Sequence, residues 1–181
     1  MPYEPPPDLA ALSLAEIAEL VEARKLPPVD RWQAETQGDS EMHIAADGRW
    51  FHQGGQIRRP AMVRAFASLL TRDDAGQHWL VTPQQKLSIE VEDAAFIAVD
   101  VREVSGALSF RLNTDDIVIA GPEHPIIARG DPETPAIYVA VRHGTEARLN
   151  RSTYAQIADI ALEGGELAVR SQGACFPLVP A

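Results

Sequence analysis

Three arginines that stand just ahead of predicted helices are the residues best placed to do chemistry. Arg58 and Arg59 precede Pro60, and Arg151 precedes Ser152. A guanidinium is an unfavourable neighbour for the positive end of a helix dipole unless an anion is bound there too. Helix N-termini and the planar arginine fork both favour carboxylates and phosphates. The placement therefore predicts a site for an anionic group.

Acidic and aromatic residues complete the predicted binding site. Glu92 and Asp93 close the alternating stretch KLSIEVED, in which Glu90 and Glu92 share one face of a strand. The predicted ligand-binding residues come from both parts of the chain: Arg59, Arg151, Glu92, Asp93, Trp50 and His52. Two alternatives stay open for the carboxylates, namely internal ion pairs with the arginines and a solvated sheet face.

Histidines and carboxylates leave a hydrolase as the second hypothesis. It would use a Glu or Asp base together with His52 or His124, and His43 could face His52 across a hairpin. The sequence lacks HExxH, GxSxG, GxGxxG and Cys-linked metal spacings, so we predict no catalytic residue, metal or cofactor. Cys175, within ACFPL, is predicted to be a buried and inert thiol.

The charge of the chain argues against some partners. Sixteen basic and 26 acidic residues give a net charge of −10, without a basic stripe. Nucleic acid and anionic membrane surfaces are disfavoured, because both are bound mainly through cationic side chains. No apolar run is long enough for a membrane helix, and the N-terminus lacks the pattern of a secretory signal. We therefore expect a cytoplasmic protein.

The elements that must position these residues follow an order that occurs twice. A capping box predicts a helix over residues 13–25. In residues 48–82, turn signals and alternation then predict a hairpin, a helix from Pro60, and a strand. AIYVAVR, His143-Gly144 and EARLN predict a second hairpin, followed by a helix capped by Ser152 and the strand ELAVR.

This order predicts an α+β fold with two structurally related halves, each a mostly antiparallel sheet packed with a helix. The proposed repeat unit is hairpin, helix, strand, although coincidence is the alternative because this order is common. The predicted division is residues 1–82, with the N-terminal helix and the first module, and residues 83–181, a β-rich half that ends in the second module.

Several long segments also resemble a known family. DGRWFHQGGQIRRPAMVRAFASLL and WLVTPQQKLSIEVEDAAF closely resemble the bacterial domain-of-unknown-function family 1285, and FRLNTDDIVIAGPEHPI fits its later part. The resemblance spans nearly the whole chain beyond the N-terminal tail. It implies two related α+β halves with a groove between them, and a signalling or ligand-binding role. It assigns no catalytic residues.

The first functional hypothesis is therefore a non-enzymatic module of signalling type that binds an anionic small molecule or a protein partner near an inter-domain groove. The hydrolase is one alternative. A structural component of an oligomer, such as a homodimer, is the other.

Overall fold

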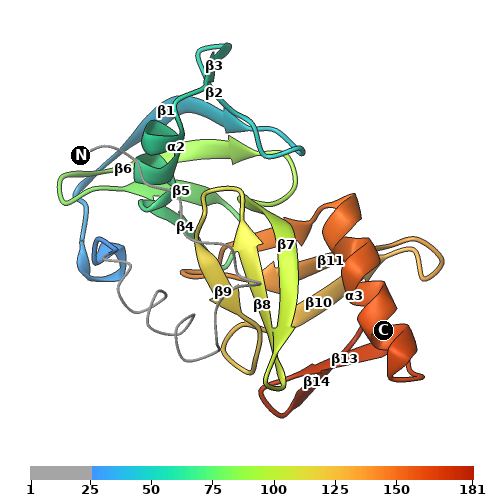
Figure 1. Ribbon diagram of the computed structural model, residues 1–181. Coiled ribbons are helices and arrows are strands. Elements are labelled where there is room, and N and C mark those ends of the chain that lie inside the picture. Colours follow the sequence, from blue (N-terminus) through green and yellow to red (C-terminus); the bar gives the residue numbers. More distant parts are fainter. Residues whose placement is uncertain (1–25) are drawn as a thin grey trace. The chain divides into compact units, whose positions relative to one another are not determined.

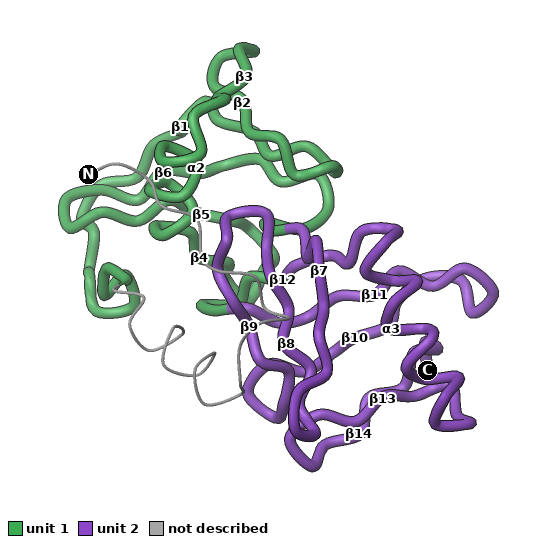
Figure 2. Tube along the Cα trace, viewed as in Figure 1, with its two compact units in different colours: residues 1–4, 25–96, 142–146 green, residues 5–24, 97–141, 147–181 purple. Residues whose placement is uncertain are grey.

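The chain folds into two compact units. The computed structural model describes residues 26–181, so the helix predicted over residues 13–25 lies outside the described part. Within that part, the first unit comprises residues 26–96 and 142–146, and the second comprises residues 97–141 and 147–181 (Figure 2). Each unit contains a six-stranded sheet.

The first unit consists of two three-stranded meanders joined by one helix (Figure 1). Its elements are the short 3-10 helix η2 (Val29–Arg31), β1 (Thr36–Ile44), β2 (Trp50–His52), β3 (Gly55–Ile57), α2 (Pro60–Ala67), β4 (Leu70–Arg72), β5 (His78–Val81) and β6 (Gln85–Val91). The strand order is β3-β2-β1-β6-β5-β4. All neighbours are antiparallel except the central pair β1 and β6, which is parallel.

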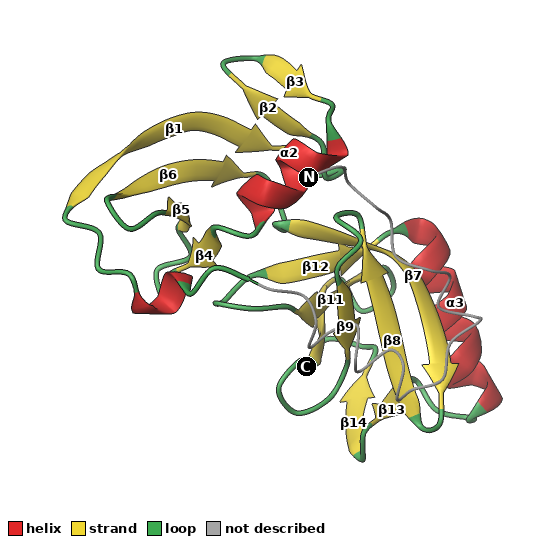
Figure 3. Cartoon of the chain, turned by 60° about the vertical axis from the view of Figure 1, so that its left-hand side comes forward, coloured by secondary structure: helices red, strands yellow, loops and turns green. Residues whose placement is uncertain are grey.

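The second unit repeats this strand order with β7 to β12 and adds a helix and a hairpin (Figure 3). Its elements are β7 (Phe96–Val104), β8 (Ala107–Leu112), β9 (Ile117–Ile119), β10 (Ile126–Gly130), β11 (Pro135–Ala140), β12 (Glu146–Leu149), α3 (Arg151–Glu163), β13 (Ala168–Ser171) and β14 (Ala174–Pro177). Its sheet runs β10-β11-β12-β7-β8-β9, while β13 and β14 form a separate ribbon.

The likeness of the two units confirms the predicted fold class. In both, the first and last strands of the sheet lie side by side at its centre, and the two meanders extend outward from them. Hairpin, helix and strand follow one another twice, as predicted. The helices nevertheless occupy different points in the strand order, because α2 follows the third strand of its sheet and α3 follows the sixth. The two units thus share the order of their strands but not the position of their helices.

Pairing of β6 determines which residues belong to the first unit. β6 lies between β1 and β5, with Thr36 opposite Gln85 and Ile89 opposite His78. The structure therefore places residues 83–96, beyond the predicted boundary, with the first unit.

The first sheet has one face packed against α2. Trp50, 1% exposed, stacks on Phe66 of α2 with 6.5 Å between ring centroids. Ile44 lies opposite Trp50 in the register and is also buried. His43 lies opposite Phe51, whereas His52 lies opposite Met42. Because side chains alternate along a strand, His43 and His52 point to opposite faces, and the prediction that they face each other was wrong.

The N-cap of helix α3 lies two residues before the predicted cap, Ser152. Asn150 is the N-cap residue, and its side-chain carbonyl accepts a hydrogen bond from the Thr153 amide at 2.9 Å. Ser152 therefore lies inside the first turn, and the prediction that it caps the helix was wrong. The asparagine carbonyl satisfies one of the amides that the first turn leaves without a helical partner. Thr153, Ile157 and Ala161 form the buried stripe of the helix.

Cys175 is exposed, which corrects the predicted buried thiol. It lies on β14 next to Phe176, which is buried. Alternation within this short strand turns Phe176 inward and Cys175 outward. The apolar neighbour Phe176 therefore packs in the interior, whereas the cysteine itself does not.

Candidate functional site

The face of the first sheet opposite α2 carries polar and aromatic side chains. We define the His43 face as His43, Arg49, Phe51, Trp79, Lys86, Ser88 and Glu90, which alternation and the strand register place on one side of the sheet. Phe51 and Trp79 are half-buried, and Arg49 and Glu90 are exposed. The face therefore displays aromatic rings among charges.

A bulge in β1 sets the position of His43 along the sheet. The β1–β6 register shifts between Asp39 and His43, and Glu41 has a left-handed φ of 57°. The Asp39 carboxylate accepts the Glu41 amide at 2.8 Å, and the Glu41 carbonyl accepts the Gln53 amide from the next hairpin at 3.0 Å. Bulges often redirect side chains at functional positions. Here β1 has two more residues than β6 between the pairs Asp39–Ser88 and His43–Glu90, and this offset puts His43 opposite Glu90, with Phe51 on its other side.

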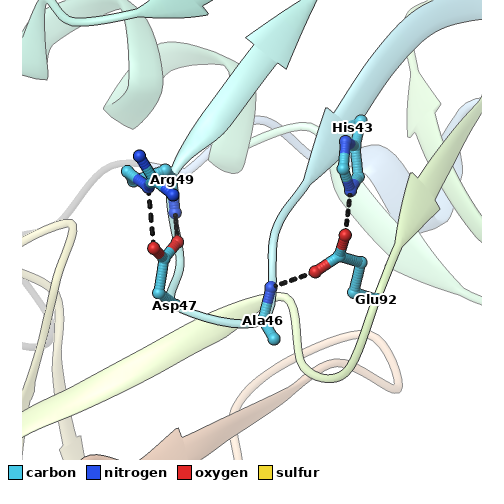
Figure 4. A network of polar contacts seen from close by, with 5 residues as sticks. All are labelled: His43, Ala46, Asp47, Arg49 and Glu92. Carbon is cyan, nitrogen blue, oxygen red and sulfur yellow. Dashed lines mark hydrogen bonds and ion pairs between the residues drawn. The ribbon is translucent and has the colours of Figure 1, made fainter.

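A carboxylate fixes the imidazole of His43 (Figure 4). His43 Nε2 and Glu92 Oε1 are 2.9 Å apart, and Glu92 Oε2 accepts the Ala46 amide at 2.7 Å. Glu92 thus holds the imidazole and the turn after β1 together. Both side chains of the pair are substantially exposed, at 34% and 46%. An exposed pair stabilises the fold little, so its effect is to orient the ring.

The Phe51 ring contacts an imidazole and a guanidinium. The His43 ring stacks on it with 5.7 Å between centroids, and the Arg49 guanidinium lies 5.6 Å from its centroid. Asp47 holds Arg49, accepting from its amide at 3.0 Å and from its Nε at 2.7 Å. These hydrogen bonds lower the pKa of Asp47, and the bond from the Arg49 amide has the largest effect. Asp47 is therefore an ionised anchor for the guanidinium.

Trp79 has a similar arrangement. Lys86 Nζ lies 4.1 Å from its ring centroid, and its indole N–H donates to Asp73 Oδ2 at 3.0 Å. The indole hydrogen bond is the largest cause that lowers the pKa of Asp73. The His43 face therefore has two aromatic rings, each approached by a cation and each held by a defined contact.

The predicted site residues are distributed over both units. Arg59 is the N-cap of α2 and Arg151 is the first residue of α3, and both are exposed. They belong to different units. Trp50 lies in the core behind the sheet, so its ring is not available at the surface.

The remaining three predicted residues belong to the first unit. His52 is exposed at the end of β2, and Asp93 is half-buried. Glu92 pairs with His43 and the Ala46 amide, in place of the arginine partner considered for it. Their roles in ligand binding stay predictions.

Phe51, Trp79 and His43 were not among the ligand-binding residues predicted from the sequence. For His43 and Phe51, the signal that could have found them is the alternation of MHI and RWFH, which turns Met42, Ile44 and Trp50 to one face and His43 and Phe51 to the other. Within residues 26–181, no group of three His, Cys, Asp or Glu side chains is placed to hold a metal ion. In the same part of the chain, no helix has the length and hydropathy to span a membrane.

Together these features define a two-domain α+β protein whose domains share one strand order. The chain belongs to the DUF1285 family: residues 27–94 match the model of its N-terminal domain, a domain of unknown function, and residues 95–178 match that of its C-terminal domain. This confirms the family indicated by the sequence.

Two solved structures are similar to this chain. A DUF1285 family protein from Silicibacter pomeroyi DSS-3 is 38% identical, with a TM-score of 0.78 over 91% of this chain and 95% of the other. A DUF1285 family protein from Shewanella baltica OS155 shares the fold, with 22% identity and a TM-score of 0.54 over 65% of this chain and 90% of the other. The comparison with curated proteins found no match.

Proposed function

We propose that this chain is a non-enzymatic binding module that takes a protein partner on the His43 face. The observation that carries the proposal is the pair of half-buried rings, Phe51 and Trp79, each with a cation at its ring. Phe51 also stacks on His43, and the Trp79 indole donates to Asp73. A cytoplasmic location is part of the proposal.

The composition of the face favours a protein as partner. Aromatic rings and arginine are enriched at the centres of protein interfaces, where they contribute much of the binding free energy. Asp47 holds Arg49 and Glu92 holds His43, so these side chains lose less conformational entropy on binding. A pre-organised surface of this kind supports binding without any large rearrangement.

An anionic small molecule is the second candidate ligand, and it would bind at the start of α2. Arg58 and Arg59 are exposed there, the first turn of α2 contains no acidic residue, and the Arg59 side chain makes no capping hydrogen bond. Native mass spectrometry of the purified protein tests this candidate. A mass excess that disappears on denaturation, and that is absent from an Arg58→Ala/Arg59→Ala variant, would support it.

The hydrolase and the oligomer component remain alternatives with their own tests. The pair that favours a hydrolase is His43 with Glu92, because the carboxylate orients the ring and leaves Nδ1 as the second nitrogen. His124, considered for this role, instead contacts the Ala140 carbonyl through Nδ1 at 3.0 Å. Hydrolysis of ester substrates that is abolished by His43→Ala would support the enzyme, and a stable dimer in light scattering would support the oligomer.

Site-specific photo-crosslinking in cells tests the proposed function. A photo-reactive amino acid replaces Glu90, which is exposed within the His43 face, and in a matched control it replaces Asp159, which is exposed on α3. We expect a discrete adduct from position 90, none of that mass from position 159, and loss of the adduct when Phe51→Ser is added. Identical adducts from both positions, or no adduct from position 90, would contradict the proposal.

A further inference from the structure

We propose that the partner adds a strand to the outer edge of β3, and that the added segment is extended and acidic. This inference rests on the proposed function, because it names the class of partner and its point of attachment. Extended peptides commonly bind to sheet edges, where backbone hydrogen bonds give affinity and side chains give specificity.

β3 is a terminal strand with an available edge. Among residues 26–181, it ends the first sheet and pairs with β2 alone. The strand at the opposite end, β4, is partly covered, because the Arg72 amide donates to the His143 carbonyl at 2.9 Å. Across residues 26–181, no backbone hydrogen bond other than those of the β2 pairing involves Gly55, Gln56 or Ile57.

The hairpin turn determines which backbone groups point outward. Gln53 and Gly54 have φ of 49° and 83° and form a two-residue turn closed by His52 and Gly55. In such a hairpin the closing pair exchanges both hydrogen bonds, and the next pair exchanges none. That next pair is Phe51 and Gln56. The Gln56 N–H and C=O therefore point away from β2, toward the free edge.

The same edge continues to an arginine. Arg58 is two residues beyond Gln56, so in an extended chain its N–H and C=O also point outward. Gln56 lies opposite Phe51, which places its side chain on the side of the His43 face. A strand added beside Gln56 would therefore extend the proposed binding surface. Pro60 begins α2 and ends the edge.

Charge identifies the chemistry of the partner. Arg58 and Arg59 are exposed and form no ion pair with the described residues, in a chain whose net charge is −10. Neighbouring residues of an extended strand point to opposite faces, so these two guanidiniums lie on both sides of the edge. A segment with acidic residues at consecutive positions can place one carboxylate on each side. Charge-assisted hydrogen bonds to arginine would then select it over a neutral strand.

The test uses three synthetic probes and NMR spectroscopy of the full chain. The first probe is an acetylated octapeptide in which Glu-Glu pairs alternate with Thr-Val pairs. The second is the same peptide with N-methyl groups at alternate residues, which remove the hydrogen bonds of one strand edge. The third has Lys in place of Glu. We expect only the first probe to bind, with the largest amide shifts at Gln56 and Arg58 and with slower hydrogen exchange at both.

Four variants separate the backbone from the side chains. Gln56→Pro removes the outward N–H and leaves the β2 pairing intact, whereas Gln56→Ala keeps that N–H. We expect Gln56→Pro and Arg58→Glu/Arg59→Glu to weaken binding of the first probe by about tenfold or more, and Gln56→Ala by less than about threefold. Arg170→Glu in the second unit, where the arginine side chain is 75% exposed, should leave binding unchanged. Circular dichroism verifies that each variant is folded.

The outcomes distinguish this inference from the proposed function. If the adduct from position 90 forms equally with Gln56→Pro and no probe binds, the strand-addition inference is overturned and the binding face stands. If the first probe binds and Gln56→Pro abolishes that binding while no adduct forms, the edge is supported and the His43 face is overturned. Equal binding of the acidic and basic probes would overturn the role of the arginines, which would then protect the edge from other strands.

Discussion

A buried histidine in the first unit should make the protein lose stability as the pH falls below 7. His78 is 8% exposed on β5, and its register partner on β4 is Arg72, which pairs with Glu146 at 3.2 Å. Burial, and to a smaller extent the charge of Arg72, lower the pKa of His78 from 6.5 to about 4, against the opposing effects of Glu146 and Asp73. The imidazole is therefore neutral in the folded protein at pH 5.

The sign and size of the effect follow from proton linkage. Between pH 6.5 and about 4 the unfolded chain binds a proton at His78 that the folded chain does not, so the free energy of unfolding decreases as the pH falls. A pKa difference of about 2.5 corresponds to about 3 kcal/mol once the pH reaches 4, and to about 2 kcal/mol at pH 5. Above pH 6.5 His78 is neutral in both the folded and the unfolded state, so it causes no further change in the free energy of unfolding.

The assay is urea unfolding at pH 7 and pH 5 for the natural chain and for His78→Gln. The glutamine variant has no proton to bind, so the loss between the two pH values should be smaller in the variant by about 2 kcal/mol. Comparing the change with pH within each protein removes any constant cost of the substitution. An equal loss in the two proteins would refute the assignment of this pH dependence to His78.

Three further predictions concern the packing, the cap and a close backbone approach. Trp50→Ala should cost about 3–5 kcal/mol in urea unfolding, because the ring is 1% exposed and stacks on Phe66; a cost below about 1 kcal/mol would contradict its place in the core. Asn150→Ala should cost about 1 kcal/mol, whereas Ser152→Ala should be nearly neutral, and the reverse order would restore Ser152 as the cap. Gly130→Ala should cost roughly 1 kcal/mol because the residue has a positive φ, and Gly144→Ala should cost clearly more. Gly144 also has a positive φ, but there the new Cβ would lie 2.5 Å from the Arg72 carbonyl oxygen. Equal melting temperatures of the two variants would exclude that clash.

Local elements were predictable from the sequence because their signals are local. Asp47-Gly48 and Gly54 specify turns through backbone conformations with positive φ, and Pro60 begins α2 because its missing amide costs nothing there. Alternation in KLSIEVED likewise predicted β6, in which Ile89 is buried and Glu90 is exposed. These features need only a few neighbouring residues to form.

The candidate site was harder to predict because it depends on pairing between distant segments. Glu92 meets His43 across 49 positions of sequence, and only the parallel pairing of β1 with β6 brings them together. The bulge at Glu41 shifts the register between β1 and β6, and no glycine occupies its positive-φ position. Trp50 was predicted to bind ligand because the type of a residue says little about which face of a strand it occupies. For Asn150 and Ser152, both residue types are good caps, and the tertiary position of the helix start decided between them.

The central position of β1 and β6 has a consequence for how the first unit folds. Each meander forms from neighbouring strands, but Thr36 must find Gln85 before the sheet is complete. Closing that long loop costs entropy before any parallel hydrogen bond is made, and topologies rich in such distant contacts fold slowly. We therefore expect the meeting of the two meanders to limit the rate of folding. Until they meet, each half-sheet would expose a long unpaired strand, so we expect the newly made chain to be most prone to aggregate during this interval.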